Sequence, residues 1–285
     1  MANLDPTSPI GVFDSGVGGL SVVRAIWQEL PNEKVIFLGD QEHVPYGLRS
    51  MEEVRAFSDE ITRYLLAQGV KIIVVACNAA SAAALHHLRR TFVDFPFVGM
   101  EPALKPAAET TLSGVVGVLA TPATFQGELY ASVVERFASG VNILQHTCPG
   151  LVLQIEKGFL DAPETRVILE DALRPMLSQG IDTVVLGCTH YPFVIPLIQQ
   201  IIGPSIRVID PSPAIARRVG NILQERNLLY PKLTQPKPAW ERTSFLTTGD
   251  PTLLQAVLPR LLNIHGEVQP VQWEGDRLFG KIPSK

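Results

Sequence analysis

An internal repeat constrains the fold more than any other feature of this sequence. "GVKIIVVACNAAS" begins at Gly69, and "GIDTVVLGCTHYP" begins at Gly180. Both segments run from glycine through an apolar strand to a small residue and then a cysteine, and Cys77 and Cys188 are therefore 111 residues apart, like the glycines. Self-similarity at a fixed spacing indicates one structural unit that occurs twice. The sequence predicts two similar halves, each with a cysteine where its third strand ends.

Two more correspondences extend the repeat toward both ends of each half. "GVFDSG" from Gly11 aligns with "GVLATP" from Gly117 at an offset of 106, and a dipeptide aligns later at an offset of 109. The aligned pairs are Ser15 with Thr121, Val35 with Val141, Phe37 with Ile143, and Glu101–Pro102 with Asp210–Pro211. We therefore expect the strands of one half to have counterparts in the other.

Short apolar runs alternate with amphipathic stretches along the chain, which predicts an α/β fold. Most of the runs are nearly continuous, as is typical of strands buried on both faces of a parallel sheet. The predicted strands are Ile10–Phe13, Val35–Leu38, Ile72–Ala76, Pro96–Gly99, Val115–Leu119, Asn142–Gln145, Thr183–Gly187, Ile206–Ile209, Ser244–Thr247 and Val268–Gln272.

Local signals place helices and a loop between these strands. Ser50 and Glu53 have capping-box spacing, which predicts a helix from there to Gly69. At "TPATF", Thr121 can cap a helix whose first residue is a proline. The proline-rich segment Tyr230–Glu241 predicts an exposed loop.

These elements predict two pseudo-symmetric parallel-sheet α/β domains with the active site in the cleft between them. We expect one domain to comprise residues 1–98 and 210–285, and the other residues 99–209. In open α/β sheets ligands bind beyond the carboxyl ends of the strands, where helix N-termini favour negative charge and thiolates. Two cysteines delivered to one cleft favour chemistry over packing. Cys148 lies elsewhere in the repeat and is predicted to be structural.

Two thiols on opposite sides of one carbon form an acid–base pair that inverts a carbon acid such as an α-amino acid. The developing carbanion needs preorganised hydrogen-bond donors. Hydroxyl and amide groups at the strand ends suit that purpose: Ser15, Asn78, Thr121 and Thr189. Asp14 is placed to orient the substrate ammonium or to accept protons.

Composition and spacing argue against several other classes. The net charge of −4 disfavours a broad nucleic-acid surface, and no apolar run approaches the ~20 residues that span a bilayer. "MANLDPTSPIGVF" has no signal-peptide pattern, and three sparse cysteines suit a reducing compartment, so we expect a cytoplasmic protein. "DSGVGG" lacks the Lys-Ser/Thr ending of a P-loop, so the sequence gives little support to a nucleotide-binding site. The spacing of Cys188 and His190 does not match a common zinc site, and no metal is expected. The remaining histidines, at positions 43, 86, 87, 146 and 265, are predicted to be surface or core residues.

Five motifs together resemble the glutamate racemases, which interconvert L- and D-glutamate without a cofactor. They are "FDSGVGGLSVV" (Phe13–Val23), "VPYG" (Val44–Gly47), "ACNAAS" (Ala76–Ser81), "GCTHYP" (Gly187–Pro192) and "TTGD" (Thr247–Asp250). The resemblance covers nearly the whole chain. It implies two α/β domains facing one another, glutamate as substrate, and D-glutamate supply for peptidoglycan, cell-wall biogenesis and cell shape. It leaves open whether two copies form a homodimer.

The resemblance also implies roles for single residues. Cys77 and Cys188 would be the acid–base pair, assisted by Asp14 and His190. Glu156 matches a family acidic residue that pairs with the histidine, although a solvated helix carboxylate is an equally good interpretation. The expected substrate-binding positions are Asp14, Ser15, Tyr46, Gly47, Asn78, Ala79 through its backbone, Thr121, Thr189 and His190.

The sequence departs from the family in two places. Ala79 stands where the family usually has threonine, which removes a hydroxyl expected to bind substrate. One neutral hydrogen bond contributes ~0.5–1.5 kcal/mol, so weaker binding is expected rather than lost activity. In "GDQEHVPYG" the residues before Val44 also differ, at the expected rim of the site. A racemase for another amino acid such as aspartate, or an added gyrase-binding role, stays an alternative, although no residue specifically supports the latter.

Overall fold

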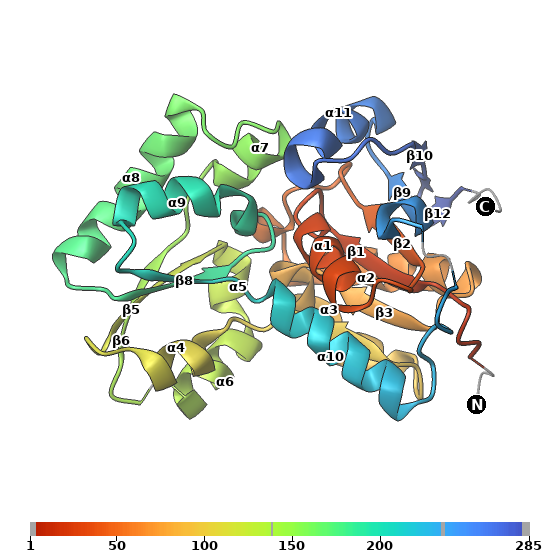
Figure 1. Cartoon of the computed structure of the whole chain (residues 1–285), viewed down its shortest axis with the longest axis horizontal. Coiled ribbons are helices and arrows are strands. Elements are labelled where there is room, and N and C mark those ends of the chain that lie inside the picture. The colour runs from red at the N-terminus through yellow and green to blue at the C-terminus, as the bar shows by residue number, and fades with distance from the viewer. Residues whose placement is uncertain (1–3, 138, 235–236, 281–285) are drawn as a thin grey trace.

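The computed structural model describes residues 4–280 except 138, 235 and 236. The described chain forms two lobes, each built on a parallel sheet (Figure 1). In the first lobe the sheet order is β10-β9-β2-β1-β3-β4, with β1 (Ile10–Asp14), β2 (Val35–Gly39), β3 (Ile72–Val75), β4 (Phe97–Gly99), β9 (Thr243–Thr247) and β10 (Val268–Pro270). In the second lobe the order is β6-β5-β7-β8, with β5 (Val115–Ala120), β6 (Asn142–His146), β7 (Thr183–Gly187) and β8 (Arg207–Ile209).

The sheet orders confirm that the chain is built from two similar halves. The order β2-β1-β3-β4 of the first lobe has the same form as β6-β5-β7-β8 of the second. The chain passes to the second lobe after β4 and returns after β8, and β9 and β10 extend only the first sheet, at the β2 edge. A short antiparallel pair, β11 (Gln272–Glu274) and β12 (Arg277–Phe279), follows.

The alignment of the two halves in the sequence matches Val35 with the wrong residue of the second half. Ile10 pairs with Val35, whereas Val116, its counterpart in the second half, pairs with Ile143. The structural counterpart of Val35 is therefore Ile143, two residues beyond the predicted Val141. A slip of two residues leaves every side chain on the same face of the sheet, so the hydrophobic pattern could not reveal it.

Helices cover both faces of each sheet. In the first lobe they are α1 (Leu20–Glu29), α2 (Met51–Ala67), α3 (Asn78–Thr91), α10 (Ser212–Glu225) and α11 (Pro251–Leu262). In the second they are α4 (Leu104–Thr110), α5 (Pro122–Gln126), α6 (Glu128–Phe137), α7 (Leu151–Glu156), α8 (Pro163–Ser178) and α9 (Ile195–Ile202). Short 3-10 turns are η1 (Tyr46–Leu48), η2 (Tyr191–Val194) and η3 (Ala239–Arg242). Helix α1 packs against α10, and α2 packs against α3. No described helix is long and apolar enough to cross a membrane.

The buried strands explain the continuous apolar runs. In β1, Ile10 and Val12 belong to the core cluster that includes α1 and α10, while Phe13 belongs to the cluster that includes α2 and α3. Both faces of the strand are therefore apolar, as a doubly covered parallel sheet requires. The first of these clusters continues into the second lobe through residues such as Val184 and Leu186 of β7, so one core joins the lobes.

Several local predictions are confirmed and others are corrected. The capping box of Ser50 and Glu53 is present, and α2 ends two residues before Gly69, whose φ is +73°. Thr121 is the N-cap residue of α5, but its hydroxyl contacts the Thr124 hydroxyl instead of a backbone N–H. The predicted strand Val268–Gln272 is split, because Pro270 cannot donate to a ladder and the chain then enters the β11–β12 pair.

The predicted loop Tyr230–Glu241 is largely exposed, but its end forms the 3-10 turn η3. Gln235 and Pro236 lie outside the described residues.

Candidate active site

The carboxyl ends of three strands bring the predicted site residues together. Asp14 is the last residue of β1, Cys77 follows β3, and Cys188 follows β7. The hydroxyl of Thr189, in the second lobe, lies 3.5 Å from Oδ2 of Asp14 in the first. The ends of β1 and β7 therefore meet at one interface between the lobes, and Cys77 lies close enough there for Asp14 and Cys188 to act on its thiol.

The Cys77 side of the site carries a carboxyl group and a hydroxyl. Its Sγ lies 3.9 Å from Oγ of Ser15, and Ser15 donates to Asp14 over 3.4 Å. Burial, and then the nearby charge of Asp14, raise the pKa of the Cys77 thiol well above its ordinary value, although the N–H of Ala80 opposes this shift. Cys77 is therefore held in the thiol form.

Asp14 is fully buried and sits between the two lobes. Its Oδ2 accepts a 2.7 Å hydrogen bond from the N–H of Gly19, at the start of α1. Burial raises the pKa of Asp14 above its ordinary value, while the charge of His190 and the hydrogen bonds to the carboxyl act in the opposite direction. A carboxyl group in this setting can exchange a proton with its neighbours.

The Cys188 side carries an imidazole and a carboxylate instead. Nδ1 of His190 lies 3.8 Å from Sγ of Cys188, and Nε2 lies 2.6 Å from Oε1 of Glu156. Burial opposes the charged ring, yet hydrogen bonds with Cys188 and Glu156 raise the pKa of His190 well above its ordinary value. Glu156 thus pairs with the histidine, and its interpretation as a solvated helix carboxylate is wrong.

The glycines of "DSGVGG" make room for this pair. A Cβ on Gly16 would lie 1.9 Å from Oε1 of Glu156, and a Cβ on Gly18 would lie 2.3 Å from Nδ1 of His190. Between them, the N–H of Val17 donates to Oε1 of Glu156 over 2.7 Å. This glycine-rich segment therefore lets a carboxylate and an imidazole from the second lobe approach the backbone of the first.

Asn78 offers polar groups that are not used within the protein. It is 4% exposed, and neither atom of its amide has a hydrogen-bond partner among the described residues. A buried amide without partners is costly, and this one begins α3 immediately after Cys77. It is thus available to a ligand at the thiol. Ala79, next along the helix, is also buried and contributes no hydroxyl.

The segment Tyr46–Gly47 meets the second lobe at Thr121. A Cβ on Gly47 would lie 2.6 Å from Cβ of Thr121, so only glycine permits this approach. The Tyr46 hydroxyl donates to the buried carboxylate of Asp40 over 2.5 Å. Tyr46 is thereby fixed in place. Burial and then the charge of Asp40 raise its pKa well above the ordinary value, and the charges of Cys77 and Asp14 add to this shift.

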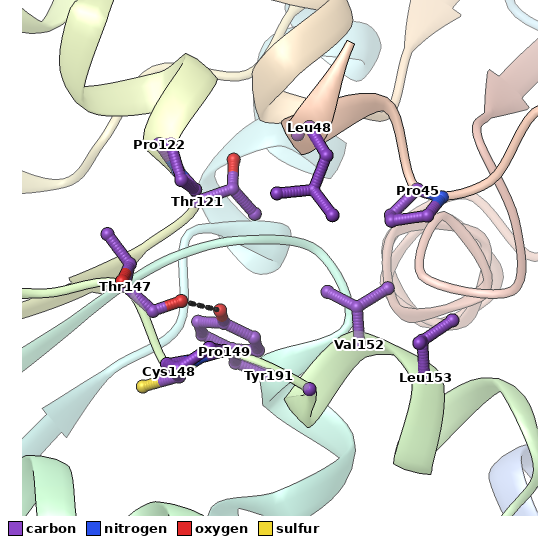
Figure 2. A pocket seen from close by; sticks show the side chains of 12 residues that line it. Pro45, Leu48, Thr121, Pro122, Thr147, Cys148, Pro149, Val152, Leu153 and Tyr191 are labelled. Atoms are coloured by element: carbon purple, nitrogen blue, oxygen red, sulfur yellow. Dashed lines mark hydrogen bonds between the residues drawn. The ribbon is translucent and has the colours of Figure 1, made fainter.

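An apolar cavity of about 120 Å³ lies where this segment contacts the second lobe. In Figure 2, Pro45 and Leu48 of the first lobe face Val152 and Leu153 of the second across it. Tyr191 closes another side and donates to the carbonyl of Thr147 over 3.4 Å. Apolar walls of this kind keep water away from neighbouring charges.

Cys148 lines the same cavity. It is a buried free cysteine, and burial raises the pKa of its thiol to about 12. Cys148 is therefore an inert thiol beside the site, in keeping with its predicted packing role.

Two residues of this region escaped the sequence reasoning. Asp40 follows β2 directly, so the rule that found Asp14 could have found it. It accepts hydrogen bonds from His43, Tyr46, Thr248 and Trp273. Gln41, which donates to Glu156 over 2.8 Å, had no signal beyond its place in the divergent "GDQEHVPYG". Among the described residues, no group of three or more His, Cys, Asp or Glu side chains could hold a metal ion.

Comparisons with known proteins show which family the chain resembles in sequence and fold. Residues 10–219 match the family described as Asp/Glu/Hydantoin racemase. A glutamate racemase of Roseiflexus sp. (strain RS-1) is 49% identical over 89% of this chain and 92% of its own. A glutamate racemase isoform of Bacillus anthracis superposes with a TM-score of 0.81 at 34% identity, covering 93% of this chain and 97% of that one. The Escherichia coli glutamate racemase, solved with L-glutamate and the activator UDP-MurNAc-Ala, gives 0.80 at 31%, covering 96% and 100%.

Proposed function

The chain belongs to the Asp/Glu/Hydantoin racemase family and is an isomerase of the glutamate racemase type, and we propose that two thiols perform its reaction. The observation that carries the proposal is the pair of unlike thiol sites at one interface. Cys77 lies beside Asp14, Cys188 lies beside His190, and Thr189 reaches from one site to the other.

In the direction from L- to D-glutamate, Cys188 acts as the base. Its thiolate takes the α-proton, so the C–H bond breaks, an S–H bond forms, and the electron pair passes into the substrate carboxylate. Cys77 then gives its thiol proton to the opposite face of the carbon, which forms the new C–H bond. The protein is left with the proton on Cys188 and the charge on Cys77, the state that starts the reverse reaction.

The residues beside each thiol favour Cys188 as the base and Cys77 as the acid in this direction. His190 carries a raised pKa, and an imidazolium beside Cys188 stabilises a thiolate there. The raised pKa of Cys77 preserves a thiol that can donate. Between turnovers in this direction Asp14 returns a proton to Cys77, while Cys188 gives up its proton to solvent through His190 and becomes a thiolate again.

The developing negative charge needs donors around the substrate carboxylate. The unpaired amide of Asn78 and the hydroxyls of Ser15 and Thr189 lie at the thiols and would fill that role. The N-terminus of α3 begins at Cys77 and adds its partial positive charge. No step requires a metal or a pyridoxal group.

The proposal includes a role in cell-wall biogenesis, in which the product D-glutamate is supplied to peptidoglycan. The activator with which the E. coli relative was solved, UDP-MurNAc-Ala, supports this role. The three free cysteines suit the reducing cytoplasm.

Circular dichroism of purified protein tests the proposed reaction. Without added cofactor and in the presence of EDTA, L-glutamate and D-glutamate should each converge on the racemic mixture. Aspartate should react more slowly than glutamate at equal concentration. Loss of activity with EDTA, or faster turnover of aspartate, would contradict the proposal.

A further inference from the structure

The side chain of Gln41 connects three segments that lie far apart in the sequence. Its Nε2 donates to Oε2 of Glu156 over 2.8 Å, across the interface between the lobes. Its Oε1 accepts from the hydroxyl of Thr247, at the end of β9, also over 2.8 Å. One amide therefore links the first sheet to the carboxylate that pairs with His190.

The "TTGD" segment fixes which way this amide points. The N–H of Gly249 donates to Oγ1 of Thr247 over 3.0 Å, so the hydroxyl hydrogen of Thr247 is free to donate to Oε1 of Gln41. The opposite end of the amide, with its two hydrogens, then faces Glu156. A Cβ on Gly249 would lie 2.9 Å from Cβ of Gln41, so the turn leaves room for this side chain.

The bond from Gln41 occupies the second oxygen of Glu156. Oε1 already accepts from the N–H of Val17 and faces Nε2 of His190. With Oε2 held by Gln41, the carboxylate plane cannot rotate without breaking a hydrogen bond. The opposite ring nitrogen of His190 is thereby kept toward Cys188, at 3.8 Å.

We propose that Gln41 is a positioning residue for the Cys188 side of the site, acting through Glu156 and His190. This inference rests on the proposed function, because it assigns Cys188 a role as base. The contacts from Gln41 end at Cys188, whereas Cys77 has Ser15 and Asp14 as its partners. Because His190 acts on Asp14 through its charge and contacts Cys188 directly, a change at Gln41 should affect Cys188 strongly and Cys77 much less.

Gln41→Met tests the proposal, because methionine has nearly the same length and cannot donate. Loss of a hydrogen bond to a charged group should lower kcat for glutamate about tenfold, while KM changes little. Thr247→Val, which removes the hydroxyl that orients the amide, should act in the same direction and more weakly. In a Glu156→Ala background, Gln41→Met should add less than about twofold, because coupled residues are not additive.

Alkylation by iodoacetamide, followed by peptide mass spectrometry, gives a readout without glutamate. The pH midpoint for Cys188 should rise by about one unit in Gln41→Met, because a loosened imidazolium stabilises the thiolate less. The midpoint for Cys77 should shift by much less, because His190 acts on that side only through its charge on Asp14. Glu42→Gln, an exposed neighbouring substitution, is the matched control and should match the unsubstituted protein in both assays.

The results separate the two proposals. If the unsubstituted protein fails to racemise glutamate, the proposed function is wrong, while the alkylation profiles still test the link from Gln41 to Cys188. An unshifted Cys188 midpoint with unchanged kcat in a folded Gln41→Met protein would overturn the link. Equal shifts at Cys77 and Cys188 would also overturn it, because they would indicate a general loosening of the interface.

Discussion

The two cysteine-bearing strand ends occupy equivalent places and have different surroundings. Cys77 and Cys188 follow the third strand of each half, in sheets of the same order. At Cys77 a long helix begins at once, and the carboxyl of Asp14 is the charged group that acts most on its thiol. At Cys188 the chain makes the short turn η2 instead, and the neighbour is the imidazole of His190. The repeat sets the position of each thiol, and the residues that differ between the halves set its charge.

This difference gives the two thiols opposite starting states under the proposed mechanism. A carboxyl beside Cys77 favours the neutral thiol, and an imidazolium beside Cys188 favours the thiolate. The free protein then holds one acid and one base at the same time. A symmetric site, with two carboxyls or two imidazoles, would hold two acids or two bases.

The largest expected effect comes from removing either thiol. Cys77→Ala or Cys188→Ala should lower racemisation in both directions by about a thousandfold or more, because each turnover needs one acid and one base. In D2O, early D-glutamate formed from L-glutamate by the unsubstituted protein should carry deuterium at Cα, while the remaining L-glutamate stays mostly protiated. Circular dichroism and proton NMR measure the two quantities.

Cys148→Ala is the matched control for these variants. Cys148 is a buried cysteine of the same lobe as Cys188 and lies beyond the proposed proton path, so its loss should leave most of the activity. Substantial racemisation by Cys77→Ala, or heavy early deuteration of recovered L-glutamate, would indicate one base serving both faces.

The same comparison shows what the sequence could predict. The strand Thr183–Gly187 was predicted with the bounds that the structure has, and both cysteines follow from the rule that sites lie beyond strand ends. Strand bounds and the positions of the cysteines depend on neighbouring residues in the chain and on a repeat that can be recognised in the sequence. The fold class therefore followed from local pattern together with this repeat.

Contacts between segments that lie far apart in the sequence could not be predicted. Gln41 lies 115 residues from Glu156 and 206 from Thr247, and no local pattern in the sequence specifies such hydrogen bonds. The two-residue slip of β6 preserves the face of every side chain, so it leaves no trace in hydropathy. Asp40 was missed although it follows a strand, because its four donors come from the loop beyond β2 and from the end of the chain.

An intermediate effect is expected from changing the neighbour of one thiol. Asp14→Asn and His190→Asn should each lower kcat/KM by about ten- to a hundredfold. Because enantiomers have equal free energies, kcat/KM must remain equal in both directions for either variant. Primary α-deuterium isotope effects distinguish the two variants. For Asp14→Asn the effect should be large from D-glutamate and small from L-glutamate. For His190→Asn it should be large from L-glutamate and small from D-glutamate. Equal isotope effects from both enantiomers would contradict the proposal that Asp14 and His190 each assist one thiol.

Thermal unfolding checks that Asp14→Asn is not simply misfolded. Burial raises the pKa of Asp14 above its ordinary value of 3.8. The stability linked to its proton is thus fully present below pH 3.8 and is lost as pH rises through the folded pKa. At about pH 8, Asp14→Asn should therefore unfold at a higher temperature than the unsubstituted protein, and this difference should shrink as the pH is lowered.

The smallest expected effect concerns the residue that corresponds to His190 in the first half. In the repeat, Cys77-Asn78-Ala79 stands opposite Cys188-Thr189-His190, so Ala79 occupies the place of the imidazole and brings neither charge nor hydroxyl. Ala79→Thr adds one hydroxyl in the first turn of α3, beside the unpaired amide of Asn78. One further neutral hydrogen bond to glutamate contributes ~0.5–1.5 kcal/mol, which should lower KM a few-fold with little change in kcat. The isotope effects should stay equal from both enantiomers, because the neighbours of both thiols are kept. A folded variant with a higher KM would show that the pocket is packed around alanine, and unequal isotope effects would show that this position acts on Cys77 as His190 acts on Cys188.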